Sequence, residues 1–119
     1  MGKTSREKGK RGERELASVL RSHGYDARRG QQYCGSSGDA DVIGLPGLHI
    51  ECKRVEKLNL ADAMSQSIAD ANPDEKPVVI HRRNNAQWLV TMRLDDFMEI
   101  YREWESGNYI VKNRLKEVK

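Results

Sequence analysis

The sequence predicts an α/β domain in which a mixed central β-sheet is flanked by helices. Its 119 residues fit one domain, because domains run to roughly 150 residues and a second core has no room. Hydrophobic residues make up 37% and charged residues 33%, which predicts a small core beneath a strongly hydrated surface. Apolar segments with helical spacing and short apolar runs follow in the order helix, strand, strand, strand, helix, strand, strand, helix.

The first predicted helix carries apolar residues at helical intervals over 16–20 and ends just before Gly24, a natural stop signal. Gly9 and Gly12 each cost a helix about 1 kcal/mol relative to alanine. Thr4 and Glu7 have the spacing of a capping box, so two starts are open: one at Thr4 and one only near Lys10.

Short apolar runs bounded by turn residues predict five strands, at 25–29, 40–45, 48–55, 78–80 and 87–91. Pro46-Gly47 separates the second run from the third, so an antiparallel hairpin is the simplest interpretation. Residues 30–38 have the composition of a surface loop.

Asn59 is predicted to cap the second helix, which ends at Asn72-Pro73. Its apolar stripe is formed by Leu60, Met64, Ile68 and Ala71.

The third helix carries an aromatic stripe at i, i+3, i+4 and i+7, and Gly107 is predicted to stop it. The stripe consists of Phe97, Ile100, Tyr101 and Trp104. Core packing is its expected fate, and a dimer interface is the alternative. Residues 108–119 show no clear period and are expected to form an arm that packs on a partner chain or frays.

The charge is concentrated at the start of the chain. The net charge is +3, and residues 1–30 carry nine basic side chains against four acidic ones. Such a patch suits phosphate, with a solvated helix face as the alternative. No apolar run approaches the roughly 18 residues of a membrane span, and the charged start is no signal peptide. We therefore expect a cytoplasmic protein.

Glu13 lies on the apolar side of the first helix. At about 100° per residue, Leu16 falls about 60° from it, whereas Glu15 is about 200° away and faces solvent. A carboxylate on a buried face costs several kcal/mol unless it is paired or binds a cation. Glu13 is therefore predicted to have a partner, although a salt bridge to Arg6 or Lys10 beyond the buried stripe is the alternative.

Glu51 and Lys53 project together from the strand at 48–55, because side chains alternate between its faces, with Ile50 and Cys52 on the other side. A carboxylate can ligate a hard divalent cation, and a neighbouring lysine can hold an attacking water. The alternative is an ordinary ion pair on a half-exposed strand.

Asp41 begins the other arm of the hairpin, so the register decides its side. A two-residue Pro46-Gly47 loop would pair positions whose numbers add to 93, with Asp41 and Glu51 on opposite faces. An odd-length or bulged connection gives 92, which puts Asp41 directly opposite Glu51. We predict this second arrangement.

The candidate ligands are oxygen donors. Glu13, Asp41 and Glu51 suit magnesium or manganese, and the absence of a Cys or His cluster argues against zinc. Cys34 and Cys52 are 18 positions apart without a second pair, so neither a zinc motif nor a disulfide is expected.

With these residues in view, the sequence resembles the archaeal-type Holliday junction resolvases of the PD-(D/E)xK nuclease superfamily. The likeness covers about the first half of the chain and is carried by Lys8-Gly9, 13–16, Leu20, Gly24-Tyr25, Arg29, Asp41-Val42 and 50–53. A second likeness, to small resolvase-like nucleases of phages, is carried by 51–54, 58–60, Gln66, Asp70, 77–83 and 95–97.

Both resemblances imply a restriction-endonuclease-like core. They imply one nuclease domain over 1–119, with a basic N-terminal segment at 1–12 and the C-terminal arm at 108–119. Ala40 stands where the superfamily has a nominal proline, and the role of Gln66 stays open.

The resemblance also implies the site. Its catalytic residues would be Glu13, Asp41, Glu51 and Lys53. Asp41, Glu51 and the backbone carbonyl of Cys52 would ligate Mg²⁺ or Mn²⁺, with Glu13 binding directly or through water, and Lys53 would position or activate the attacking water. The positions expected to touch DNA are Lys8, Lys10, Arg11, Arg14 and Arg29.

The implied function is metal-dependent cleavage of DNA phosphodiester bonds, selective for Holliday junctions or other branched DNA. A junction has two scissile strands related by twofold symmetry, so a homodimer is expected. Neither a membrane nor an organic cofactor is expected, and a phage protein would act in the host cytoplasm. The alternatives are a non-catalytic DNA-binding accessory protein of replication or packaging, and a general duplex or flap endonuclease.

Overall fold

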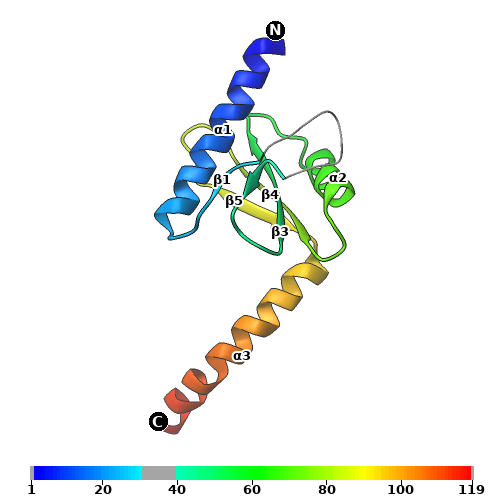
Figure 1. The fold of residues 1–119 in the computed structure, drawn as a ribbon. Coiled ribbons are helices and arrows are strands. Elements are labelled where there is room, and N and C mark those ends of the chain that lie inside the picture. The colour runs from blue at the N-terminus through cyan, green and yellow to red at the C-terminus, as the bar shows by residue number, and fades with distance from the viewer. Residues whose placement is uncertain (1, 31–39, 119) are drawn as a thin grey trace.

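The computed structural model describes the backbone of residues 2–30 and 40–118 and the side chains of residues 7–30 and 40–107. The elements follow in the predicted order, which confirms the α/β class (Figure 1). They are α1 (Gly2–Ser22), β1 (Arg28–Arg29), β2 (Val42–Ile43), β3 (Leu48–Arg54), α2 (Leu60–Asp70), β4 (Lys76–Arg82), β5 (Leu89–Met92) and α3 (Leu94–Val118).

The five strands form one mixed sheet in the order β1-β2-β3-β4-β5. Only β3 and β4 are parallel, and the other neighbours pair antiparallel. A parallel pair needs a crossover, and α2 supplies it between β3 and β4. Strands β2 and β3 pair antiparallel, so the expected hairpin is present in the structure.

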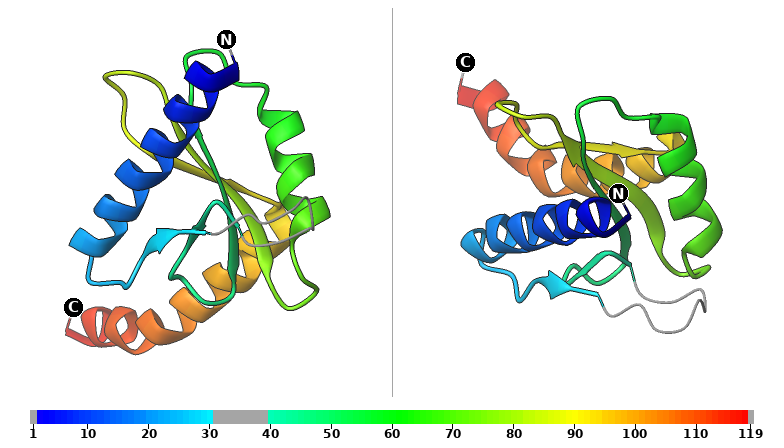
Figure 2. Two further views of the ribbon diagram at one scale, coloured as in Figure 1. Left: turned by 45° about the horizontal axis from the view of Figure 1, so that its top comes forward. Right: turned by 90° about the horizontal axis from the view of Figure 1, so that it is seen from above.

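The two faces of this sheet are covered by different helices (Figures 1 and 2). On the first face, α1 completes the main core, formed by Leu16, Ala17, Ala27, Val42, Ile50, Cys52, Val78 and Ile80. On the other face, α2 buries Ala63 and Ser67. The Ser67 hydroxyl donates to the backbone carbonyls of His49 and Val78, both at 3.1 Å, which anchors α2 across β3 and β4.

Helix α1 begins at Gly2, so the start near Lys10 is wrong, and residues 2–12 of the basic segment belong to the helix. Packing explains the difference. Gly12 is buried, and a Cβ built on it would lie 3.0 Å from the Cβ of Arg54 on β3. Glycine here allows the close approach of α1 to the sheet, which offsets its unfavourable helix propensity of about 1 kcal/mol.

Helix α2 has the predicted cap, because the Asn59 side chain accepts a hydrogen bond from the Asp62 amide at 3.1 Å. Its buried side is rotated from the predicted stripe: Ala63 and Ser67 are buried, whereas Ile68 is 40% exposed. Small residues at the contact let the helix lie close to the parallel strands.

Helix α3 differs most from the sequence expectation. It continues through Gly107 to Val118, so the predicted stop is wrong and 108–118 extend the helix rather than form a separate arm. One glycine costs about 1 kcal/mol, too little to end a helix of this length. Core packing of the aromatic stripe is also wrong, since Phe97 is 47% and Trp104 53% exposed. Helices α1 and α2 pack on strands β1 to β4, whereas α3 projects away from the sheet (Figure 1).

The protruding α3 makes the molecule elongated (Figure 1). Its extents are 62 × 33 × 27 Å, and its radius of gyration is 16.9 Å. A compact domain of this length would have a radius of about 13.5 Å. No helix in the described part of the chain is long and apolar enough to cross a membrane.

Candidate active site

The β2–β3 register decides whether the candidate acids meet. Val42 pairs with Ile50, positions that add to 92, so Asp41 lies opposite Glu51 on one face of the sheet. The connection is irregular, with positive φ angles of 124° at Gly44 and 94° at Gly47. A Cβ on Gly44 would lie 2.5 Å from the Cα of Ala27, so only glycine fits there. The predicted register is confirmed.

Asp41 is buried and held from three directions. Its backbone amide donates to the Ile50 carbonyl, and its carbonyl accepts from Gly30, both at 2.9 Å. Its Oδ2 accepts a hydrogen bond of 2.9 Å from the amide of Cys52. The backbone therefore fixes this carboxylate at the end of β2, against β3.

Glu51 stands beside Asp41 in a desolvated setting. Its side chain is 12% exposed, and Oε2 lies 3.9 Å from Nζ of Lys53. The pKa of Glu51 is raised to about 7, first by burial and then by the nearby charge of Asp41, with a smaller rise from Asp70, and the ammonium group of Lys53 opposes this rise. Two close carboxylates without full hydration favour a shared proton or a bound cation.

Glu13 reaches the same region from α1 and is 16% exposed, so the prediction that it needs a partner is confirmed. The partner is Arg29 of β1, whose Nε donates to Oε1 of Glu13 at 2.9 Å. Burial raises the pKa of Glu13, the hydrogen bond from Arg29 opposes this, and the Asp41 charge adds to the rise. The charges that shift Glu51 are those of Asp41, Lys53 and Asp70. The charges of Asp41 and Lys53 act on both Glu13 and Glu51, so the four side chains form one electrostatic cluster.

Cys52 marks the centre of this arrangement. Its thiol is free and buried, and its pKa is raised by burial and then by the charges of Asp41, Glu13 and Glu51. Its amide points to Asp41. In a strand the N–H and C=O of one residue leave on the same side, so the Cys52 carbonyl is directed to the Asp41 side of β3.

The donor set fits a hard cation. Within the described residues, no group of three or more His, Cys, Asp and Glu side chains could hold a metal ion. Mg²⁺ needs fewer protein side chains than zinc does, because it is commonly bound through one or two carboxylates and keeps several waters. Asp41, Glu51 and the carbonyl of Cys52 offer oxygen donors from two adjacent strands.

The candidate DNA contacts divide into two groups. Lys8, Lys10, Arg11 and Arg14 are exposed on α1, and none of them forms an ion pair with another side chain of 7–30 or 40–107. Arg29 is only 35% exposed and is engaged by Glu13. It is therefore placed to orient that acid.

Glu15 was missed by the sequence argument, which put it in solvent. It links two arginines: its Oε1 lies 2.8 Å from Nε of Arg82, and its Oε2 lies 3.1 Å from Nε of Arg54. The Arg82 guanidinium lies 5.6 Å from the ring centre of Trp88. These contacts hold α1 against the ends of β3 and β4, next to Lys53. Single-helix periodicity could not reveal them, because both partners come from strands.

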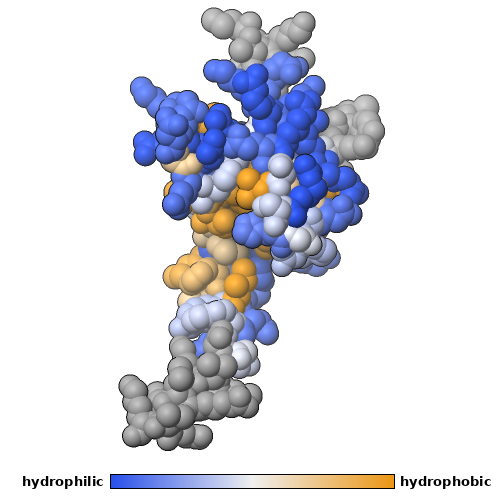
Figure 3. Space-filling model, turned by 90° about the vertical axis from the view of Figure 1, so that its left-hand side faces the viewer, coloured by the Kyte–Doolittle hydropathy of each residue, from blue (hydrophilic) through white to orange (hydrophobic). Residues whose placement is uncertain are grey.

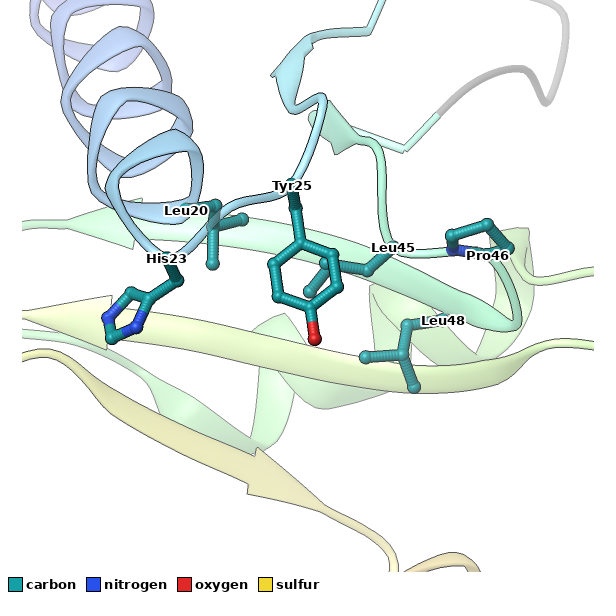
Figure 4. Close-up of a pocket in the computed structure, with 6 residues that line it drawn as sticks. All are labelled: Leu20, His23, Tyr25, Leu45, Pro46 and Leu48. Atoms are coloured by element: carbon teal, nitrogen blue, oxygen red, sulfur yellow. The ribbon is translucent and has the colours of Figure 1, made fainter.

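A separate hollow lies at the other end of α1, and Figure 4 shows the Tyr25 ring among its lining residues. They are Leu20, His23, Tyr25, Leu45, Pro46 and Leu48. This lining holds no carboxylate, lysine or arginine, so it lacks the carboxylate oxygens that bind Mg²⁺ and the permanent positive charge that binds a phosphate.

Comparison with known proteins gives the class of this protein. A family described as "Phage putative PDDEXK endonuclease" matches residues 4–118. The chain therefore belongs to this endonuclease family. Its fold is similar to that of Hjc from Archaeoglobus fulgidus, described as a Holliday junction resolvase from an archaeal hyperthermophile. The TM-score is 0.54 at 27% identity, over 71% of this chain and 72% of Hjc. A search of curated protein sequences finds no match.

Proposed function

We propose that the protein is a divalent-metal-dependent endodeoxyribonuclease that cuts Holliday junctions or other branched DNA. The observation that carries the proposal is the β2–β3 register, which puts Asp41 and Glu51 on one face beside Lys53. Membership of the PDDEXK family supports the reaction class, and the likeness to Hjc supports branched DNA as the substrate.

The chain's own groups suggest a division of roles. Asp41, Glu51 and the Cys52 carbonyl would hold Mg²⁺ or Mn²⁺, which when bound offsets the charge that develops on the scissile phosphate. Lys53 orients the attacking water through its ammonium group. Glu13 acts beside Asp41, directly or through water, and Arg29 orients its carboxylate.

The exposed basic face of α1 positions the DNA backbone. Lys8, Lys10, Arg11 and Arg14 would contact phosphates, with Arg29 as a further contact at the edge of the site. Backbone contacts carry no base information, so binding should depend strongly on salt and little on sequence. Because a junction presents two scissile strands and each chain has one such site, the active form would be a homodimer.

A cleavage assay tests this function. Four-way, forked, single-stranded and linear duplex DNA are compared with Mg²⁺, with Mn²⁺ and with a chelator. We expect metal-dependent cutting with the junction cut fastest, and loss of cutting in Lys53→Ala. Lys57→Ala is the matched control, because it removes an exposed lysine four positions away.

Each outcome separates the candidates. Undiminished cutting by Lys53→Ala rejects the site. Binding of DNA without cutting under any metal condition favours the accessory protein, and equal rates on all duplex substrates favour the general endonuclease.

A further inference from the structure

Six of the nine large hydrophobic residues that are exposed in the described part of the chain lie on β5 and the first half of α3. They are between 42% and 70% exposed and comprise Leu89, Val90, Leu94, Phe97, Ile100 and Trp104. Figure 3 shows apolar side chains continuing from the body of the protein onto α3. Neighbouring rings on the helix are in contact, with centroids 6.3 Å apart for Phe97 and Tyr101 and 5.5 Å for Tyr101 and Trp104.

Within residues 7–30 and 40–107, the side chains of this surface are largely open to solvent. Helix α3 makes only sparse contacts with the other described elements, one of which is the ion pair of Lys76 with Glu99. β5 is an edge strand, with β4 on one side only. A long protruding helix gains most of its stability from packing an amphipathic face, so α3 requires a partner.

The sequence of α3 has the spacing of a coiled coil. From Leu94 the positions advance by three and four residues in turn, as the a and d positions of a heptad do. They are occupied by Leu94, Phe97, Tyr101, Trp104, Asn108, Val111, Leu115 and Val118. The frame set by the first half of the helix thus gives 108–118 a period that this segment does not show by itself. Asn108 falls at an a position, where one polar residue commonly selects register and partner number.

The distribution of charge along α3 favours a second copy of α3, running antiparallel, as its partner. Residues 94–105 carry five acidic side chains and one basic, whereas residues 106–119 carry four basic and one acidic. Two copies of α3 running antiparallel bring each acidic half against a basic half, and parallel helices would oppose like charges. The acidic first half, which carries the aromatic stripe, would also repel DNA.

Side-chain sizes favour the same direction. Full antiparallel overlap pairs positions whose numbers add to 212. The layers would then pair Leu94 with Val118, Phe97 with Leu115, Tyr101 with Val111 and Trp104 with Asn108. Each aromatic residue meets a smaller one, as a well-packed core requires, whereas a parallel pair would set Trp104 against Trp104.

We infer that α3 binds α3 of a second copy of this chain as an antiparallel two-helix coiled coil. This specifies the homodimer of the proposed function and rests on that function for its biological role. The test measures association and not cleavage, so the two can fail separately.

The first experiment measures the mass of the full chain by light scattering after gel filtration. We expect twice the chain mass of 13.6 kDa. Trp104→Glu should halve the observed mass, whereas Ser106→Glu, which adds the same charge at an exposed position off the stripe, should keep it. Circular dichroism verifies that both remain folded. A folded wild-type monomer, or a Trp104→Glu dimer, overturns the proposal.

The second experiment tests direction by oxidative cross-linking in a Cys34→Ser background, with buried Cys52 retained. Tyr101→Cys and Val111→Cys should each give little disulfide dimer alone and a mixed dimer when combined. Efficient cross-linking of Tyr101→Cys with itself shows parallel helices and overturns the antiparallel arrangement. Lys53→Ala should dimerise as the wild type does, whatever its activity.

Discussion

The two ends of this chain use apolar patterning with opposite outcomes. At α1, the stripe around Leu16 is fully buried against the sheet and brings Glu13 to the edge of the carboxylate site. At α3, an equally regular stripe around Phe97 stays exposed. The difference lies in the surface available, because β3 and β4 offer α1 an uncovered apolar face and offer α3 none. An amphipathic pattern therefore predicts that a helix packs on some surface, but it does not predict whether that surface belongs to the same molecule.

Substitution of Asp41, in the carboxylate site, should have the largest effect on the protein. Asp41→Asn removes a charge but keeps an acceptor for the Cys52 amide, so we expect a folded protein with cleavage reduced by about 10³-fold. Asp41→Ala should also lose stability, by about 1 to 3 kcal/mol, because the buried amide loses its acceptor. Cleavage rates and urea unfolding check both variants. Wild-type cleavage by Asp41→Asn would remove Asp41 from the site.

The two stripes should also differ in their contribution to the stability of the dilute chain. Leu16→Ala opens a cavity in the main core and should cost about 2 to 5 kcal/mol in the free energy of unfolding. Trp104→Ala should cost less than about 0.5 kcal/mol at concentrations where the chain is monomeric, since the residue is exposed. Urea unfolding compares the two. Similar costs would mean that α3 packs on its own domain.

Glu51 links pH to the stability of the metal-free protein. Its pKa is about 7 in the folded chain and 4.5 ordinarily, so the folded state binds the proton more tightly than the unfolded state. Proton binding by Glu51 therefore adds to the free energy of unfolding. This addition is fully present below about pH 4.5, and up to about 3 kcal/mol of it is lost as the pH rises through 7. Glu51→Gln should remove that fall.

Urea unfolding at about pH 5 and about pH 8 measures it. Exposed Glu7→Gln is the matched control and should keep the wild-type dependence. An unchanged pH dependence in Glu51→Gln would show that the carboxyl is not desolvated.

Replacement of two helical glycines by alanine should have the smallest effect on stability. A Cβ on Gly107 would meet nothing within 4 Å, so Gly107→Ala should stabilise α3 by about 1 kcal/mol. At Gly12 the added Cβ would lie 3.0 Å from the Cβ of Arg54, so Gly12→Ala should lose that gain to crowding. Thermal unfolding of both variants checks the difference. Equal stabilisation would mean that α1 lies farther from β3.

The site was more predictable than its surroundings. The Asp41–Glu51 register followed from the chemistry of a shared cation, and the cap at Asn59 followed from local hydrogen bonding. The role of Glu15 did not follow, because Arg54 and Arg82 reach it from strands that are distant in sequence. The buried side of α2 was likewise set by the strands beneath it.

What the sequence determined by itself was the element order, the alternation that puts Glu51 and Lys53 on one side of a strand, and the capping and turn residues. These depend on local geometry, which a short stretch of chain carries with it. Only the tertiary structure decided that Arg29 is the partner of Glu13, that Gly12 lies against Arg54, and that α3 projects away from the sheet. Each of these depends on the space left once the sheet and its helices have packed, and no local pattern encodes that space.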